Sequence, residues 1–209
     1  FAQSLATTYA SDNGQSGVMF DIAAITNVSV CTFDINLAPG AWDVRIYRLP
    51  AATGYATQVT NSAAWTLLGT TSGVVSAGLN VPTPLPIFIS VPIAAGTTQA
   101  FYIATTNGLG IKYTTGGPGS GGTVYASDAN LRIHVGSGVP YPFQLNLSPR
   151  ILNGTVHYQT SCSCPAPPFA LNQPHSSLDV NGVIGDGNNP AIVNVCVGQP
   201  LTATFVGQF

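Results

Sequence analysis

The stretch VSVCTFDINLAPGAWDVRIYRL, residues 28–49, decides the fold class. In its first half, apolar side chains stand at every second position from Cys31 to Leu37. This period of two is typical of a β-strand with one buried face, whereas a helix would repeat its apolar residues every three or four positions. The sequence therefore predicts a strand that ends near Leu37.

The second half of this stretch predicts another strand. Pro39 followed by Gly40 is the order that a type II turn favours, because Pro fixes φ and Gly accepts a positive φ. Beyond the turn, Val44 and Ile46 face one side and the polar residues between them face the other. We expect the two strands to form an antiparallel hairpin.

Similar runs continue along the chain and are separated by its many glycines and prolines. No helical period intervenes between them. The fold class predicted for residues 1–159 is therefore all-β, an antiparallel β-sandwich of jelly-roll type. The later candidate strands are Trp65–Thr70, Gly73–Leu79, Pro86–Ile93, Gln99–Thr105, Ile111–Thr114, Thr123–Ala126, Leu131–Val135 and Ile151–Tyr158.

Charge is scarce in this chain. Its 209 residues include 5 basic and 7 acidic side chains, no Glu, and Lys112 as the only Lys. Surface helices normally use Glu, Lys and Arg, so the composition also argues against helices. A net charge of -2 gives no electrostatic reason to bind nucleic acid or an anionic membrane. No apolar run is long enough for a membrane-spanning helix.

The four cysteines, Cys31, Cys162, Cys164 and Cys196, predict disulfides and an oxidising compartment. Cys162 and Cys164 are too close along the chain to bridge each other comfortably. Each would therefore pair with Cys31 or with Cys196, and the choice stays open. Zinc is the competing interpretation, but the CxC spacing and the lack of a nearby His do not favour it. The start at Phe1 fits a cleaved signal peptide or a trimmed chain.

A boundary is predicted at residues 160–168, where TSCSCPAPP indicates a stiff, extended linker. Residues 169–209 follow, a short β-rich segment with three candidate strands, Ser177–Val183, Ala191–Val197 and Leu201–Val206. About forty residues cannot normally support a core of their own. We expect this segment to be the start of a second domain, or strands completed by a neighbouring subunit.

The tetrapeptide YASD occurs twice and ends in Asp12 and in Asp128. The flanking sequences do not match, so the copies do not indicate a domain repeat. Ser-Asp after a strand favours a turn, because both side chains can hydrogen-bond the nearby backbone. The alternative is that the two carboxylates converge on one structural Ca²⁺. Neither copy has the ligand density of a dedicated calcium loop, so we expect no cofactor.

Five phrases resemble a β-sandwich module of large secreted bacterial surface proteins and exoproteins. They are GQSGVMFDI (14–22), AWDVRIY (41–47), AWTLLGT (64–70), LNVPTPLPI (79–87) and YPFQLNLSPRILNGTVHY (141–158). The resemblance covers residues 4–158 and includes no catalytic motif. It implies an extracellular or cell-surface location and a modular, non-enzymatic role. LDVNGVIGDG (178–187) resembles the opening of a further module in such proteins.

Aromatic side chains are the best candidates for a ligand site. Trp42, Trp65 and Tyr47 could form a flat platform on which sugar rings stack. The alternative is that both Trp side chains belong to the core or the hairpin. No nucleophile or metal motif is present, so we expect no enzymatic activity, and a hydrolase stays the third hypothesis.

The missing charge suggests self-association. Soluble sandwiches commonly protect their edge strands with Lys and other charges, which this chain lacks. Its apolar runs LPIFISVPI and AIVNVCVG are reasonable if a neighbouring copy or another surface module covers them by strand addition. We therefore expect a secreted structural or adhesive module of a surface or extracellular fibre. The alternative is a carbohydrate-binding module.

Overall fold

The computed structural model describes residues 3–160 and, beyond them, three strands at residues 176–180, 183–185 and 203–207. The chain divides into two compact units, residues 1–160 and residues 161–209, and each is described by itself. Within the described part of the chain, no helix is long and apolar enough to span a membrane.

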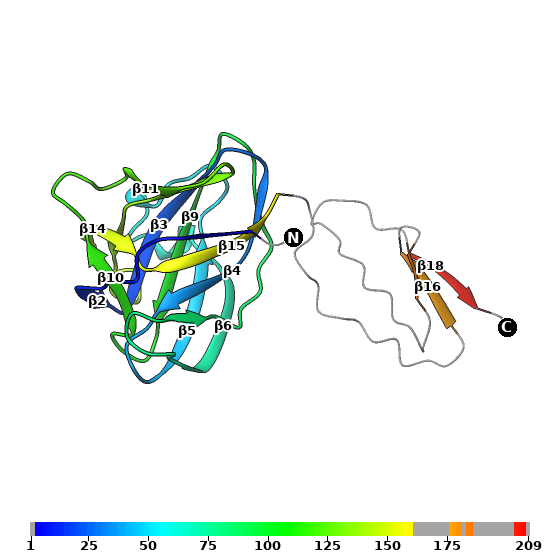
Figure 1. Cartoon of the computed structure of the whole chain (residues 1–209), viewed down its shortest axis with the longest axis horizontal. Helices are drawn as coiled ribbons and strands as arrows, with labels where there is room; N and C mark the ends of the chain where they lie inside the picture. Colours follow the sequence, from blue (N-terminus) through cyan, green and yellow to red (C-terminus); the bar gives the residue numbers. More distant parts are fainter. Residues whose placement is uncertain (1–2, 161–175, 181–182, 186–202, 208–209) are drawn as a thin grey trace. The chain divides into compact units, whose positions relative to one another are not determined.

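The first unit is an antiparallel β-sandwich, as predicted (Figure 1). One sheet has five strands: β1 (Gln3–Ala6), β15 (Gly154–Gln159), β4 (Val28–Asn36), β7 (Pro82–Pro84) and β8 (Val91–Ile93). The other sheet has ten strands. Eight of them follow one another in the order β2 (Asn13–Gln15), β10 (Ile111–Thr115), β14 (Leu147–Leu152), β13 (Gly136–Gly138), β3 (Gly17–Ala24), β9 (Thr98–Thr105), β5 (Ala41–Arg48) and β6 (Thr66–Val75). The other two, β11 (Val124–Ser127) and β12 (Leu131–His134), lie off this path. β7 and β8 both pair with β4, and β12 pairs with β3 and β11.

Three phenylalanines join the two sheets at the centre of the core. Phe20 on β3 and Phe101 on β9 stack at 6.0 Å between ring centroids, and both come from the larger sheet. Phe33 on β4 meets them edge-on from the smaller sheet, at 5.9 Å and 5.3 Å. All three side chains are fully buried. The alternation that predicted β4 therefore faces the core, as expected.

The predicted hairpin between β4 and β5 is wrong. β4 pairs with β15, β7 and β8, whereas β5 pairs with β6 and β9 in the other sheet. The turn at Pro39–Gly40 thus carries the chain from one sheet to the other, with Gly40 at φ +138°. Both strands still bury their apolar residues, because the two sheets face the same core. Alternating apolar residues indicate that one face of a strand is buried, but they do not identify the strand that pairs with it.

Two predicted strands, Trp65–Thr70 and Gly73–Leu79, are one strand. β6 runs from Thr66 to Val75 along β5, and its register shifts twice along the way. Gly73 lies near the second shift with φ +69°. Glycine at a positive φ is typical of a β-bulge, which bends a strand without ending it. Gly73, which predicted a break between two strands, marks a bend within one strand.

The second unit contains β16 (Ser176–Val180), β17 (Val183–Gly185) and β18 (Ala203–Gly207). β16 pairs antiparallel with both of the others. β16 and β18 overlap the first and third strands predicted after the linker. The predicted strand at Ala191–Val197 and the linker residues 161–168 lie outside the described residues.

Candidate functional site

Trp65 and Tyr47, two of the proposed sugar-binding rings, belong to a second apolar cluster on the outer face of the larger sheet. Each is 7% exposed. Tyr102 stacks on Tyr47 at 5.7 Å between centroids and meets Trp65 at 6.0 Å. Phe143 contacts both from the loop after β13. Other aromatic rings thus cover the faces that a sugar would need.

Trp42 is half-buried and packs against the main core. Its indole N–H donates to the carbonyl of Ala38 at 2.7 Å. A Cβ added to Gly110 would lie only 2.6 Å from the ring, so the glycine backbone packs directly on the indole. These placements do not support an exposed platform built from Trp42, Trp65 and Tyr47.

Asp12 and Asp128, the candidate calcium ligands, serve different turns. Asp12 accepts a hydrogen bond from the amide of Thr115 at 2.7 Å, and the neighbouring Thr114 bonds Asn153, just before β15. Asp128 bonds Tyr158, at the other end of β15. Five residues of extended strand span about 16 Å. The two carboxylates therefore do not converge on one ion, and no group of three or more acidic, His or Cys side chains suited to a metal occurs among the described residues.

The second YASD copy has the turn role that its sequence predicts. The Asp128 carboxylate accepts from the amides of Asn130 and Leu131, at 2.8 and 2.9 Å, and from the hydroxyl of Tyr158. Burial by itself raises the pKa of this carboxyl, but these hydrogen bonds lower it more, so the pKa lies below its usual value. Burial and the Asp128 carboxylate raise the pKa of Tyr158 to about 12.

We expect Asp128→Asn to lower the free energy of unfolding at pH 7 by about 0.5–1 kcal/mol, because it weakens three hydrogen bonds at a partly exposed site. A carboxyl with a depressed folded pKa stabilises the fold above its unfolded pKa, and this stability is lost as the pH falls through the folded pKa. The difference from wild type should therefore shrink below about pH 4. Urea unfolding at several pH values measures it. An unchanged difference at low pH would contradict this role.

The histidines and cysteines form no recognisable catalytic group among the described residues. Nδ1 of His134 lies 2.8 Å from the carbonyl of Gly122, and Nε2 of His157 lies 2.9 Å from the Asp34 carboxylate. Within residues 3–160, no serine side chain forms a hydrogen bond with either His. Cys31 is on β4 and is 7% exposed. His175 and the cysteines Cys162, Cys164 and Cys196 lie outside the described residues, so the disulfide pairing stays a prediction.

One edge of the sandwich is closed by proline. Along residues 82–92 beside β4, even-numbered side chains are exposed and odd-numbered ones are buried. Leu85 and Ile89 donate their N–H groups to Phe33 and Cys31 of β4. The N–H of each even-numbered residue therefore points away from the sheet. Four of these six positions are Pro and have no N–H to offer: Pro82, Pro84, Pro86 and Pro92.

The opposite situation holds at β6, the edge strand of the larger sheet. Its sequence TLLGTTSGVV has neither proline nor charge over ten residues. Thr106 of the chain after β9 donates to the carbonyl of Asp43, so Val44 and Ile46 direct their backbone groups to β6. Thr70 lies opposite Arg45, between these two positions, and its N–H and C=O therefore point to solvent.

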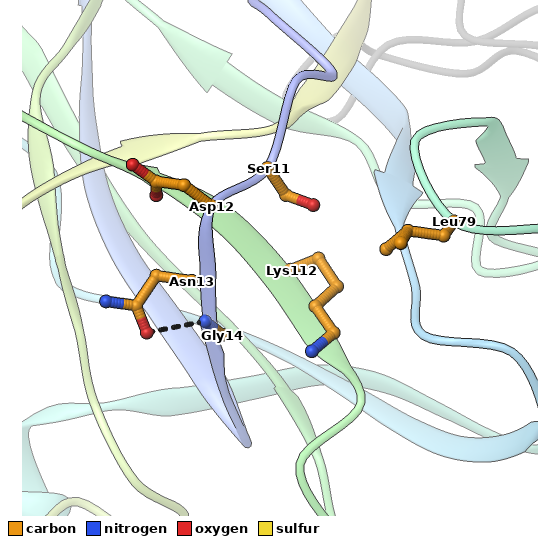
Figure 2. A pocket seen from close by; sticks show the side chains of 6 residues that line it. All are labelled: Ser11, Asp12, Asn13, Gly14, Leu79 and Lys112. Atoms are coloured by element: carbon orange, nitrogen blue, oxygen red, sulfur yellow. Dashed lines mark hydrogen bonds between the residues drawn. The ribbon is translucent and has the colours of Figure 1, made fainter.

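A shallow pocket of about 400 Å³ lies at β2 and β10 (Figure 2), the strands at the other end of the larger sheet's strand order from β6. It is lined by Ser11, Asp12, Asn13, Gly14, Leu79 and Lys112. Among the described residues, none forms an ion pair or hydrogen bond with the Lys112 ammonium. These residues come from three separate segments of the chain, so no sequence motif groups them.

No protein-family model matches the sequence, and no curated protein matches it. Among solved structures, the chain is similar to the cysteine protease and lectin-like domains of Cwp84, a surface layer associated protein of Clostridium difficile. The identity is 12% and the TM-score is 0.41. The match covers 77% of this chain and 36% of that chain, so this chain spans about a third of its length. At these values the likeness carries no argument about function.

Proposed function

We propose that this chain is a secreted structural or adhesive module that joins a second copy through its edge strand β6. The observation that carries the proposal is the contrast between two edges. Proline removes most outward N–H groups beside β4, whereas β6 keeps its own and has no charged side chain. Edge strands that lack such protection are the usual sites of strand addition.

A second copy suits β6 better than a charged partner does. In a two-fold contact the same residues of both copies meet, so a charge on the strand would face its own kind. β6 brings no charge to that contact. Its exposed apolar side chains, Leu67 at 45% and Val75 at 74%, would lose water on pairing.

The bends in β6 limit this contact. The register shifts on both sides of Gly69–Thr71 leave a short straight segment around Thr70. We expect a weak, reversible contact, which becomes effective where many copies are held on one surface or fibre. A two-fold contact closes a dimer, so a fibre needs a second contact, for which residues 169–209 remain our hypothesis.

Secretion and the absence of enzymatic activity are parts of the same proposal. The low charge, the four cysteines and the resemblance to secreted bacterial modules support a location outside the cell or at its surface. We propose no catalytic, cofactor or nucleic-acid role. Carbohydrate binding stays the alternative, although Trp42, Trp65 and Tyr47 offer it no open platform.

We expect Thr70→Lys to abolish the association, because it places a charge at the centre of the contact and a like charge directly opposite. Thr60→Lys is the matched control, since it adds the same charge at an exposed loop position outside β6. Sedimentation velocity over a concentration series measures the outcome. Equal association of both variants and wild type would contradict the role of β6.

A further inference from the structure

We propose that the pocket at Lys112 binds the carboxylate of an acidic saccharide. This inference does not depend on the strand contact at β6, because the pocket lies on different strands. Its starting point is the Lys112 side chain on β10, the only lysine of the chain. It is half-buried, and no described residue pairs with its ammonium. A partly buried cation without a counter-charge favours an anionic ligand.

The Lys112 side chain lies against the backbone of Gly14 on β2. Gly14 pairs with Lys112 in the ladder between β2 and β10. A Cβ at Gly14 would lie 2.9 Å from Cδ of Lys112, 3.1 Å from Nζ and 2.8 Å from the carbonyl oxygen of Ile111. The lysine stem therefore lies against a bare backbone, and any side chain at residue 14 would displace it.

Ser11, across the pocket from Lys112, is fixed by a hydrogen-bond network with Asn80 and Asn36. Ser11 donates both its N–H and its hydroxyl to Oδ1 of Asn80, at 3.0 and 2.6 Å. Asn80 has φ +65° and is held by the fully buried Asn36. The backbone N–H of Asn80 donates to Oδ1 of Asn36, and Nδ2 of Asn36 donates to Oδ1 of Asn80. The Ser11 hydroxyl keeps its lone pairs for a ligand donor, such as a sugar hydroxyl.

The acidic and apolar residues of the pocket narrow the class of ligand. Figure 2 shows Ser11, Leu79 and Lys112 on one side of β2, with Asp12 and Asn13 on the other. Asp12 is bonded to the Thr115 amide and does not neutralise the lysine. Leu79 is 49% exposed and offers an apolar contact to the C–H face of a sugar ring. Ammonium, hydroxyl and apolar patch together fit a sugar that carries a carboxylate.

The single lysine gives a direct test. Reductive ¹³C-methylation keeps its charge and yields one lysine resonance besides that of the amino terminus. We expect this resonance to shift in a saturable way when digalacturonate is added to the full chain. The neutral disaccharide of galactose should leave it unchanged, and acetate should shift it only weakly, because it lacks the hydroxyls and the ring.

Two variants distinguish binding in the pocket from a non-specific attraction between the saccharide and a positive charge. We expect Lys112→Gln to weaken digalacturonate binding about tenfold or more. Binding to this variant is followed through the backbone amide signals of Gly14 and of the residues next to position 112. Gly14→Ala should weaken it while the ammonium is retained, and thermal unfolding shows whether that variant is folded. Equal shifts with the neutral disaccharide, no saturation, or undiminished binding by folded Gly14→Ala would each overturn the proposal.

Discussion

The Gly136→Ala variant is expected to lose about 3 kcal/mol or more of its free energy of unfolding, enough to leave much of the protein unfolded. Gly136 lies on β13, and β13 pairs with the central strand β3. A Cβ at this position would collide with the carbonyl oxygen of Met19 and lie 3.1 Å from Cα of Phe20. Both are backbone atoms of β3, so no side-chain rotation can relieve the overlap.

Gly117→Ala is the matched control for this prediction. Gly117 lies in the loop between β10 and β11, and a Cβ there meets nothing within 4 Å. Its free energy of unfolding should change by less than about 0.5 kcal/mol. Urea unfolding of both variants measures the difference. A Gly136→Ala variant as stable as Gly117→Ala would mean that β13 does not pack on β3 as described.

The second large effect is expected at Phe33, whose ring closes the aromatic group between the sheets. Phe33→Ala should cost about 3–5 kcal/mol, because the smaller side chain leaves a cavity beside Phe20 and Phe101. Phe33→Leu keeps most of the volume and should cost about 1.5 kcal/mol or less.

Phe88→Ala provides the control, with the same substitution at a side chain that is 71% exposed. Its free energy of unfolding should stay close to that of wild type when monomers are compared at low concentration. Equal losses at Phe33 and Phe88 would contradict the arrangement of the two sheets around the phenylalanines.

The sequence predicted the fold class because alternation and low charge are local properties of the chain. It did not predict the partner of each strand. β4 and β5 show the reason, since both alternate towards one core although they belong to different sheets. β3 was not recognised, because most of its side chains on both faces are buried and its apolar run does not alternate.

The edges were predicted only in part. The scarcity of charge predicts that a neighbouring copy or module covers the edges of the sandwich, yet residues 82–92 protect an edge without any charge. The signal was present in LNVPTPLPI, where Pro alternates, but its meaning depends on which residues face β4. The candidate sites depended even more on tertiary structure. Tyr47 was expected at the surface, but residues from loops distant in sequence, among them Phe143, bury it. The pocket at Lys112 is likewise formed by segments that are far apart in the sequence.

Hydrogen exchange at the β6 amides tests the central claim most directly. The Thr70 N–H points to solvent in a single copy and would be hydrogen-bonded in a pair of copies. We predict that this amide exchanges rapidly in dilute wild-type protein and becomes protected at high concentration, while Thr70→Lys stays unprotected. An amide at Thr70 that exchanges equally fast at both concentrations, with the protein either monomeric or associated, would contradict assembly through β6.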